Sequence, residues 1–333
     1  MTGAQEIVAV DVGGTHARFA IATIDAGGLI ALSEPATLKT QDHAGFQAAW
    51  DAYREMMGGY LPDAVAIAVA ALVNSEVIHF TNNPWTFHPP LIAQELGCKS
   101  HVIVNDFEAV AHAVARSSND HFVHLAGPEI DLPGSGTISV IGPGTGLGVA
   151  QFYRDGQGRN GGGYRVHSTE GGHGAFAPLD AVEDAILTRL RNRFPRVSNE
   201  RVISGPAIVD IYAALAAMEG HAIRDLDDVT IWETGLSGEE SLAAAAVDRF
   251  CLALGSVAGD IALSHGACGV VITGGLGYRI RDTLLRSDFA ARFTAKGRFS
   301  DHMATLPVKI LTHSQPGLVG AALAYAQSIA SAF

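Results

Sequence analysis

Residues 7–22 read IVAVDVGGTHARFAIA, and this stretch decides how the chain folds. An apolar run ends at Asp11, the chain turns through Gly13-Gly14-Thr15-His16, and a second apolar run follows. Two β-prone runs joined by a glycine turn predict a hairpin. Because glycine lacks a Cβ, the turn can point backbone N–H groups into one space and let an anion approach closely. An ordinary hairpin, in which these residues only form the turn, is the alternative at this point.

Three polar side chains flank or belong to this turn, namely Asp11, Thr15 and Arg18. The Thr15 hydroxyl and the Arg18 guanidinium can donate hydrogen bonds to an anion. A carboxylate beside a phosphate is repulsive, so Asp11 fits best if a hydrated Mg²⁺ lies between the two. We therefore expect a Mg²⁺–phosphate group near Asp11, with no metal site built from protein ligands alone.

Length and composition narrow the class of protein. A chain of 333 residues with 48% hydrophobic and 17% charged residues favours two domains with real cores. A net charge of −12, without a cluster of basic residues, argues against a nucleic-acid partner. We expect no apolar run of transmembrane length, no signal peptide and no membrane anchor. The three cysteines lack zinc-ligand spacing and fit a reducing cytoplasm.

The glycine hairpin occurs twice. Residues 138–152, ISVIGPGTGLGVAQF, repeat the strand, glycine turn and strand of residues 7–22. Two such hairpins, each opening one half of the chain, form an internal repeat. We expect the second turn, at Gly144, Thr145 and Gly146, to bind phosphate together with Gly13 and Gly14 of the first.

Apolar periodicity supplies the remaining elements and an α/β class. The polar run at residues 117–120 is the expected domain boundary. Residues 168–174 are too rich in glycine for a helix or strand, and residues 274–277 are expected to form a turn. The expected strands are residues 29–38, 64–71, 101–104, 269–273 and 308–312, and the expected helices are residues 45–57, 90–96, 107–116, 179–193, 206–218 and 239–264 and a last helix that ends near residue 330.

Asn105 and Asp106 lie where an apolar strand ends and a helix begins, a usual place for functional groups in open α/β sheets. A carboxylate there can orient a substrate hydroxyl and accept its proton as the hydroxyl attacks phosphorus. Either residue could instead simply cap the helix.

A second polar set could bind a polyol. Planar amides, carboxylates and an imidazole make paired hydrogen bonds to neighbouring hydroxyls. Glu170-x-x-His173 could instead ligate a metal, although Gly171-Gly172 disfavours the helix that this spacing usually needs. Taken singly, Glu200 could be an exposed charge and Asn82 a turn former. The set is Asn82, Asn105, Glu170, His173 and Glu200.

Gly274 and Gly275 follow a buried strand, where a flat base could lie against the backbone or a helix could begin.

Together these motifs resemble the bacterial ATP-dependent glucokinases, in the group without a zinc-binding cysteine motif, over essentially the whole chain. The resemblance rests on D-x-G-G-T-x-A-R at Asp11, N-D-F at Asn105, G-x-G-T-G-L-G at Gly142, E-G-G-H at Glu170 and E-R-x-x-S-G-P at Glu200. It implies the actin-like ATPase (ribonuclease H-like) fold, with two α/β domains and an active-site cleft between them. The smaller domain would be residues 1–116 plus 315–333, and the larger one residues 117–314.

The resemblance also implies roles. Asp106 would be the catalytic base, and Asn105, Glu170, His173 and Glu200 would bind glucose, with Asn82 also on the sugar side. ATP and Mg²⁺ would be the cofactors, and the chain would be a cytoplasmic enzyme, a homodimer, without a nucleic-acid or membrane partner. The alternatives are a related hexose kinase of other specificity, a non-catalytic sugar or nucleotide sensor, and an actin-like ATPase.

Overall fold

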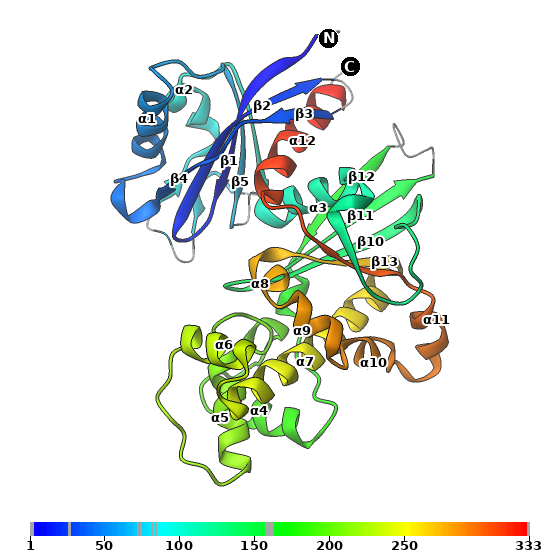
Figure 1. Cartoon of the computed structure of the whole chain (residues 1–333). Coiled ribbons are helices and arrows are strands. Elements are labelled where there is room, and N and C mark those ends of the chain that lie inside the picture. Colours follow the sequence, from blue (N-terminus) through cyan, green and yellow to red (C-terminus); the bar gives the residue numbers. More distant parts are fainter. Residues whose placement is uncertain are drawn as a thin grey trace. The chain divides into compact units, whose positions relative to one another are not determined.

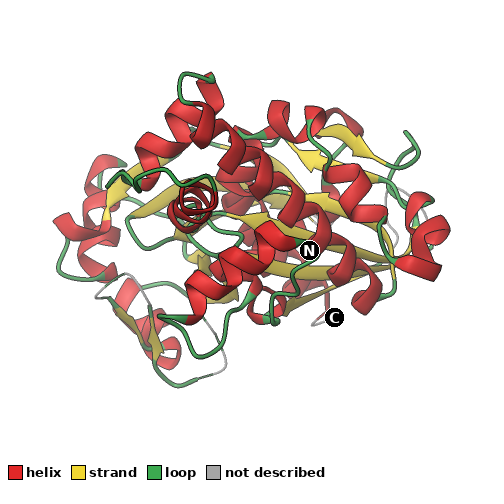
Figure 2. Ribbon diagram, turned by 90° about the horizontal axis from the view of Figure 1, so that it is seen from below, coloured by secondary structure: helices red, strands yellow, loops and turns green. Residues whose placement is uncertain are grey.

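The computed structural model describes residues 3–25, 28–71, 73, 75–80, 83, 85–156 and 163–331 (Figure 1). The chain divides into two compact units. Unit 1 comprises Met1–Ser117, Val166–Ser168 and His313–Phe333, and unit 2 comprises Ser118–Arg165 and Thr169–Thr312. Each unit contains one six-stranded mixed sheet with helices. Figure 2 distinguishes the helices from the strands by colour.

The sheet of unit 1 has the order β3-β2-β1-β5-β8, with β4 also paired to β2. Strands β1 and β2 are antiparallel and place Asp11 opposite Arg18, whereas β1, β5 and β8 are parallel. The hairpin predicted from the first glycine turn is therefore confirmed. The strands are β1 (Gln5–Val12), β2 (His16–Asp25), β3 (Gly28–Leu32), β4 (Ala36–Lys39), β5 (Ala64–Val69) and β8 (Ser100–Asn105), and a separate small pair is β6 (Ile78–His79) and β7 (Thr86–Phe87).

Helices cover both faces of this sheet because its central strands are apolar on both sides. Along β1, Val8 and Val10 join a core that includes Trp50 of α1, and the alternate residues Ile7 and Ala9 join the core of α12. The helices are α1 (Phe46–Met56), α2 (Ile92–Leu96), α3 (Asp106–Arg116) and α12 (Pro316–Ser331), and the short 3₁₀ turns are Thr40–Asp42 and Pro89–Leu91.

The sheet of unit 2 repeats this plan with the order β12-β11-β10-β13-β14-β9. Its first hairpin, β10 with β11, is antiparallel, and β10, β13 and β14 are parallel neighbours. The predicted internal repeat is confirmed by this topology. The strands are β9 (Phe122–Ala126), β10 (Ser135–Pro143), β11 (Leu147–Asp155), β12 (Tyr164–Thr169), β13 (Ala267–Ile272) and β14 (Val308–Leu311).

The helices of unit 2 surround α7, its longest. The helices are α4 (Ala181–Arg191), α5 (Ile208–Met218), α6 (Asp228–Ser237), α7 (Ser241–His265), α8 (Gly274–Arg279), α9 (Arg281–Arg286), α10 (Phe289–Thr294) and α11 (Ser300–Ala304). The expectation of no apolar run of transmembrane length is wrong for α7, because this helix is long and apolar enough to cross a membrane by length and composition alone. However, 72% of its apolar window is buried inside the structure, so α7 serves as a core helix.

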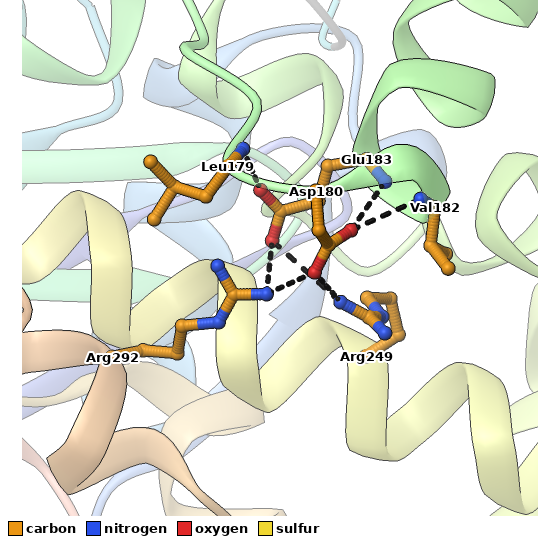
Figure 3. Close-up of polar contacts among 6 residues, drawn as sticks. All are labelled: Leu179, Asp180, Val182, Glu183, Arg249 and Arg292. Atoms are coloured by element: carbon orange, nitrogen blue, oxygen red, sulfur yellow. Dashed lines mark hydrogen bonds and ion pairs between the residues drawn. The ribbon is translucent and has the colours of Figure 1, made fainter.

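An ion cluster ties three of these helices together (Figure 3). The Asp180 carboxylate caps α4 by accepting from the backbone N–H groups of Val182 and Glu183, and it also pairs with Arg249 of α7 and Arg292 of α10. Burial alone would raise the pKa of Asp180, but these hydrogen bonds and guanidinium groups together lower it. Burial raises the pKa of Glu183, whose side chain is completely buried.

Several local expectations need correction. The single strand expected over residues 29–38 is interrupted before Pro35, and the Ser33 hydroxyl accepts the Ile21 N–H at the break. Residues 274–277 belong to the first turns of α8. Pro316 begins α12 instead of preceding it. Proline is tolerated there because the N–H groups of the first helical turn have no partner within the helix, so the N–H that proline lacks is not missed. In residues 168–174, Ser168 and Thr169 extend β12 and Gly171–His173 forms a 3₁₀ turn.

Candidate active site

The predicted residues of unit 1 gather where its parallel strands end. In the register of the sheet, Val12 pairs with Val69, and Val69 pairs with Asn105. The glycine turn after β1 and the start of α3 after β8 therefore leave the same edge of the sheet, the edge at which open α/β sheets bind ligands. This grouping follows from the strand order and needs no contact with unit 2.

The first glycine turn is held in place through its carbonyl groups. Gly13 N–H donates to the His16 carbonyl over 2.9 Å, which closes the turn. The Thr40 hydroxyl donates to the Gly14 carbonyl over 2.9 Å, and Asn83 Nδ2 donates to the Gly13 carbonyl over 3.3 Å. Both Thr40 and Asn83 are buried, so they are rigid supports. Thr15 itself is exposed at the tip, where its hydroxyl can meet a ligand.

The carboxylate of Asp11 lies between a guanidinium and the start of a helix. Arg18 Nη1 is 3.5 Å from Asp11 Oδ2. A Cβ added to Gly317 in the first turn of α12 would lie 2.6 Å from the same oxygen, so only glycine fits there. Burial raises the pKa of Asp11, while the charge and hydrogen bond of Arg18 oppose this change. The donor set, one carboxylate beside a turn able to bind phosphate, fits a hydrated Mg²⁺.

Asn105 and Asp106 occupy different positions at the start of α3. Asn105 caps α3, because its Oδ1 accepts from the N–H groups of Phe107 and Glu108 over 2.9 and 3.3 Å. Its Nδ2 donates to the Ala71 carbonyl over 3.3 Å, which links the cap to the segment after β5. Asp106 is the first residue of α3 and is half-buried. The capping alternative is therefore correct for Asn105, and the cap fixes the backbone that carries the Asp106 carboxylate.

The second glycine turn joins β10 and β11 in unit 2. The strands pair as far as Pro143 with Leu147, and Gly144 N–H donates to the Gly146 carbonyl over 2.8 Å. Thr145 is exposed at the tip, as Thr15 is in the first turn. A Cβ added to Gly144 would meet no described heavy atom within 4 Å, so this backbone is open to a ligand.

Glu200 lies directly against this turn. Its Oε2 accepts from the Leu147 N–H over 3.0 Å, and a Cβ added to Gly146 would lie 2.4 Å from the same oxygen. The exposed-charge alternative is therefore wrong for Glu200, which is half-buried and bonded to the backbone. A glycine at position 146 is needed to admit this carboxylate.

Glu170 and His173 lie beside the same turn. Their 3₁₀ turn packs on the start of β11 so closely that a Cβ at Gly172 would lie 2.1 Å from the Leu147 carbonyl oxygen. A bridge between Ala175 and Ser198 then pairs the chain after His173 with the chain before Glu200. Glu170 Oε2 and His173 Nε2 are 3.7 Å apart, and both side chains are 56% exposed, so their polar atoms remain available to a ligand.

The Gly274-Gly275 segment lies at this same edge of unit 2. Gly274 follows β13 and has a φ of +84°, and a Cβ there would lie 2.9 Å from the Pro143 carbonyl. A Cβ at Gly275 would meet no described heavy atom within 4 Å. The helix-entry alternative is correct, and the open face at Gly275 leaves room for a flat group against the backbone.

Some functional positions were not predicted, and one predicted position cannot be assessed. Asn82 lies outside the described residues. Thr40 and Asn83 support the first turn through hydrogen bonds with sequence separations of 26 and 70 residues, so no local pattern indicates their role. Gly205, which belongs to the E-R-x-x-S-G-P motif, supports the second turn through Gly144. Among the described residues, no group of three or more His, Cys, Asp or Glu side chains could hold a metal ion.

Comparisons with known proteins agree with this geometry. The family model for glucokinase matches residues 8–328. The glucokinase of Zymomonas mobilis is 53% identical over 321 residues, which cover 96% of this chain and 98% of that protein. The glucokinase of Paramagnetospirillum magneticum is 39% identical over 323 residues, covering 96% and 97%.

Solved structures extend the likeness to the fold. The crystal structure of a glucokinase from an Antarctic psychrotroph matches with a TM-score of 0.81 and 34% identity, over 96% of this chain and 98% of that chain. The hexokinase of the ROK family from Thermus thermophilus matches with a TM-score of 0.64 and 18% identity, over 98% and 100%, which concerns the fold alone. The predicted actin-like α/β fold is confirmed. By its family model, its full-length relatives and its fold, the chain belongs to the glucokinase family.

Proposed function

We propose that this chain transfers the γ-phosphoryl group of Mg²⁺-bound ATP to the 6-hydroxyl of D-glucose, giving glucose 6-phosphate and ADP. Membership of the glucokinase family makes it an ATP-dependent hexose kinase. The observation that carries the finer proposal is the grouping of Glu170, His173 and Glu200 around the second glycine turn. A set of hydroxyl-binding side chains beside a phosphate-binding turn is what transfer to a sugar requires.

Asp106 is the proposed catalytic base. It orients the 6-hydroxyl and accepts its proton as the oxygen attacks the γ-phosphorus, and the bond from that phosphorus to the β–γ bridging oxygen breaks. The cap made by Asn105 supports this role, because it fixes the first turn of α3 from which Asp106 projects. Positioning and electrostatics supply most of the rate acceleration in such transfers.

The sugar ligands are proposed to be Asn105, Glu170, His173 and Glu200. Asn105 has already committed one N–H and its Oδ1 to the backbone, so its second N–H is the group that can reach a hydroxyl. Glu170 and His173 are exposed and close to each other, which suits two neighbouring hydroxyls. A carboxylate has two acceptor oxygens, so Glu200 can accept a hydrogen bond from a sugar hydroxyl at Oε1 while Oε2 accepts from the Leu147 N–H.

The nucleotide is proposed to bind the two glycine turns and α8. Backbone N–H groups of Gly13, Gly14 and residues 144–146 would bind the phosphates, helped by the Thr15 and Thr145 hydroxyls and by Arg18. Asp11 would bind water on the Mg²⁺ ion, and Gly274 and Gly275 would lie against the base. When bound, Mg²⁺ neutralises phosphate charge, which makes attack by a hydroxyl oxygen easier.

A coupled assay over a panel of hexoses and phosphoryl donors tests the function. We expect ADP and glucose 6-phosphate to form in equal amounts, with glucose as the preferred sugar and ATP as the preferred donor. Preference for another hexose would leave the proposed kinase activity standing and would contradict only the proposed substrate, glucose. ATP hydrolysis that needs no sugar, or glucose binding without any turnover, would contradict the proposal and favour an ATPase or a sensor.

We further propose that residues 1–116 with 315–333 and residues 117–314 are the two domains, and that the chain acts as a cytoplasmic homodimer. The bounds of the two compact units agree with these domain bounds to within a few residues at the main crossings between them. Sedimentation velocity at micromolar concentration tests the dimer, which a single species at the mass of one chain, 34.8 kDa, would contradict.

A further inference from the structure

Trp232 lies in the core of unit 2 and makes one directed polar contact. It belongs to α6, it is 2% exposed, and its ring meets Phe250 of α7 edge to face, with centroids 5.0 Å apart. Its Nε1–H donates to the Gly205 carbonyl over 2.8 Å. Because Phe250 fixes the ring plane, the position of the indole N–H also fixes the position of the Gly205 peptide.

Gly205 is in turn hydrogen-bonded to the second glycine turn. Its N–H donates to the Gly144 carbonyl over 2.7 Å. A Cβ at Gly205 would lie 3.3 Å from the same carbonyl oxygen, so the two backbones are in close contact. Gly144 in turn donates its own N–H to Gly146 within the turn. A chain of hydrogen bonds therefore runs from the Trp232 indole through Gly205 to the turn.

The same ring also contacts the helix at the proposed base site. The Arg279 guanidinium carbon is 5.4 Å from the centroid of the Trp232 ring, within the range of a cation–π contact. Arg279 is the last residue of α8, and α8 begins at Gly274, against the Pro143 carbonyl. Trp232 thus contacts both structures that the nucleotide is proposed to use, the turn through Gly205 and α8 through Arg279.

We propose that Trp232 is a positioning residue for the nucleotide. It touches neither substrate, and it holds the second glycine turn and α8 in the mutual arrangement that ATP needs. The proposal rests on the function proposed above, because it assumes that the turn binds phosphate and that α8 meets the base. Within the described part of the chain, Glu170 and His173 have no hydrogen bond or ring contact with Trp232, and Glu200 meets the turn at Leu147, whereas Gly205 meets it at Gly144. We therefore expect a larger effect on ATP than on glucose.

Trp232→Phe tests the hydrogen bond, since it keeps an aromatic ring and removes the N–H donor together with part of the indole, a loss of ring atoms that the Trp50→Phe control shares. We expect the KM for ATP to rise about three- to tenfold, the value of about one hydrogen bond, while kcat and the KM for glucose change by less than about twofold. Arg279→Met tests the second contact. It keeps the aliphatic stem and removes the charge, and we expect the KM for ATP to rise about two- to fivefold.

Trp50→Phe is the matched control. In the described part of the chain, the Trp50 Nε1 atom is buried in unit 1 without a hydrogen-bond partner. This change should leave all three constants as in the wild type, and the Tm of each variant shows whether it is folded. If Trp232→Phe does not fold, Arg279→Met alone decides.

Two results would overturn the proposal: an unchanged KM for ATP in the folded variants, or equal rises in the KM for ATP and for glucose. Absence of ATP-dependent glucose phosphorylation in the wild type would instead refute the proposed function, so the two failures are distinguishable.

Discussion

The two glycine turns share a topology and differ in where their charge comes from. Each follows the first strand of an antiparallel hairpin whose next neighbour is a parallel strand, and each exposes a threonine directly after a glycine. The first hairpin contains its own ion pair, Asp11 with Arg18. The second turn contains no charged residue and receives the Glu200 carboxylate from a segment more than fifty residues later. A repeated backbone plan thus carries two different arrangements of charge.

On the basis of this difference we propose a division of labour between the two turns. In this proposal the first turn, flanked by Asp11 and Arg18, serves a metal ion and the phosphates around it, because a carboxylate beside phosphate oxygens can hold a hydrated Mg²⁺. The neutral second turn offers only N–H groups and a hydroxyl to phosphate, while the carboxylate beside it can face a sugar. The following predictions test this division, from the largest expected effect to the smallest.

Asp106→Asn should cause the largest loss. The amide keeps the size of the side chain and cannot accept the hydroxyl proton, so we expect kcat to fall by about 10²–10⁴-fold with little change in glucose affinity. Steady-state kinetics with a direct measurement of the glucose Kd checks this. If a third of the wild-type kcat remains, unit 1 does not supply the base.

Glu170→Gln and His173→Ala should raise the KM for glucose by about ten- to a hundredfold, because hydrogen bonds to charged groups are lost from a site built for hydroxyls. The KM for ATP should change little if sugar and nucleotide are bound by different groups around the second turn. Equal changes in both constants would remove that distinction. Chelators should have no effect beyond the removal of Mg²⁺, and loss of activity together with stoichiometric zinc would revive a metal site at these residues.

Gly146→Ala and Gly144→Ala form a matched pair within one turn. A Cβ at position 146 collides with Glu200, whereas a Cβ at position 144 meets no described atom and fills the space proposed for phosphate. We therefore expect the first change to raise mainly the KM for glucose and the second to raise mainly the KM for ATP, each by about tenfold. Kinetics with either substrate varied at saturation of the other measures this. The reverse pattern would exchange the roles assigned to the two glycines.

The units should also differ in how their ion pairs affect stability. Asp180 pairs with Arg249 and Arg292, which are 19% and 17% exposed, whereas the Lys99–Asp63 pair of unit 1 is largely exposed. Asp180→Asn should lower the free energy of unfolding by about 1–3 kcal/mol at pH 7, a value reduced for the partial exposure of Asp180. Asp63→Asn should leave Tm unchanged within error.

The pH dependence of this effect has a definite sign. The pKa of Asp180 is lower in the folded protein than its ordinary value of 3.8, so its ionised form stabilises the fold above that value. The contribution is lost as the pH falls through the folded pKa. Urea unfolding from pH 7 downward should show the wild type and Asp180→Asn converging below about pH 3.8. If the two proteins still differ in the free energy of unfolding at these low pH values, the effect of the substitution is due to packing and not to the charge of Asp180.

Much of this account could be predicted from the sequence because its signals are local. The hairpin from Gln5 to Asp25 and its repeat follow from alternating apolar residues around glycines, and α7 follows from a long apolar stripe. Asn105 and Asp106 could be placed at a strand–helix junction for the same reason. The family resemblance supplied the assignments that single residues left open.

The remainder depends on contacts between distant segments. That Asn105 and not Asp106 is the cap depends on backbone angles, and the contact of Glu200 with Leu147 depends on a bridge at Ala175 and Ser198. Helix α6 was not predicted because it contains Thr, Gly and Ser and its apolar residues do not form a clear stripe. Its start is set by Asp227, whose side chain accepts a hydrogen bond from the Thr230 N–H. Supports such as Thr40 and Asn83 act on the first turn from separate loops, for which no sequence spacing gives a signal.

The most direct test of the division of labour is a Mg²⁺ titration of Asp11→Asn and Gly144→Ala at saturating glucose. Removing the Asp11 charge should raise the free Mg²⁺ concentration for half-maximal rate by about tenfold or more, because a charge-assisted contact to the hydrated ion is lost. Gly144→Ala should leave that concentration unchanged while it raises the KM for Mg²⁺-bound ATP. Equal Mg²⁺ requirements in the two variants, or a raised requirement in Gly144→Ala alone, would contradict the account.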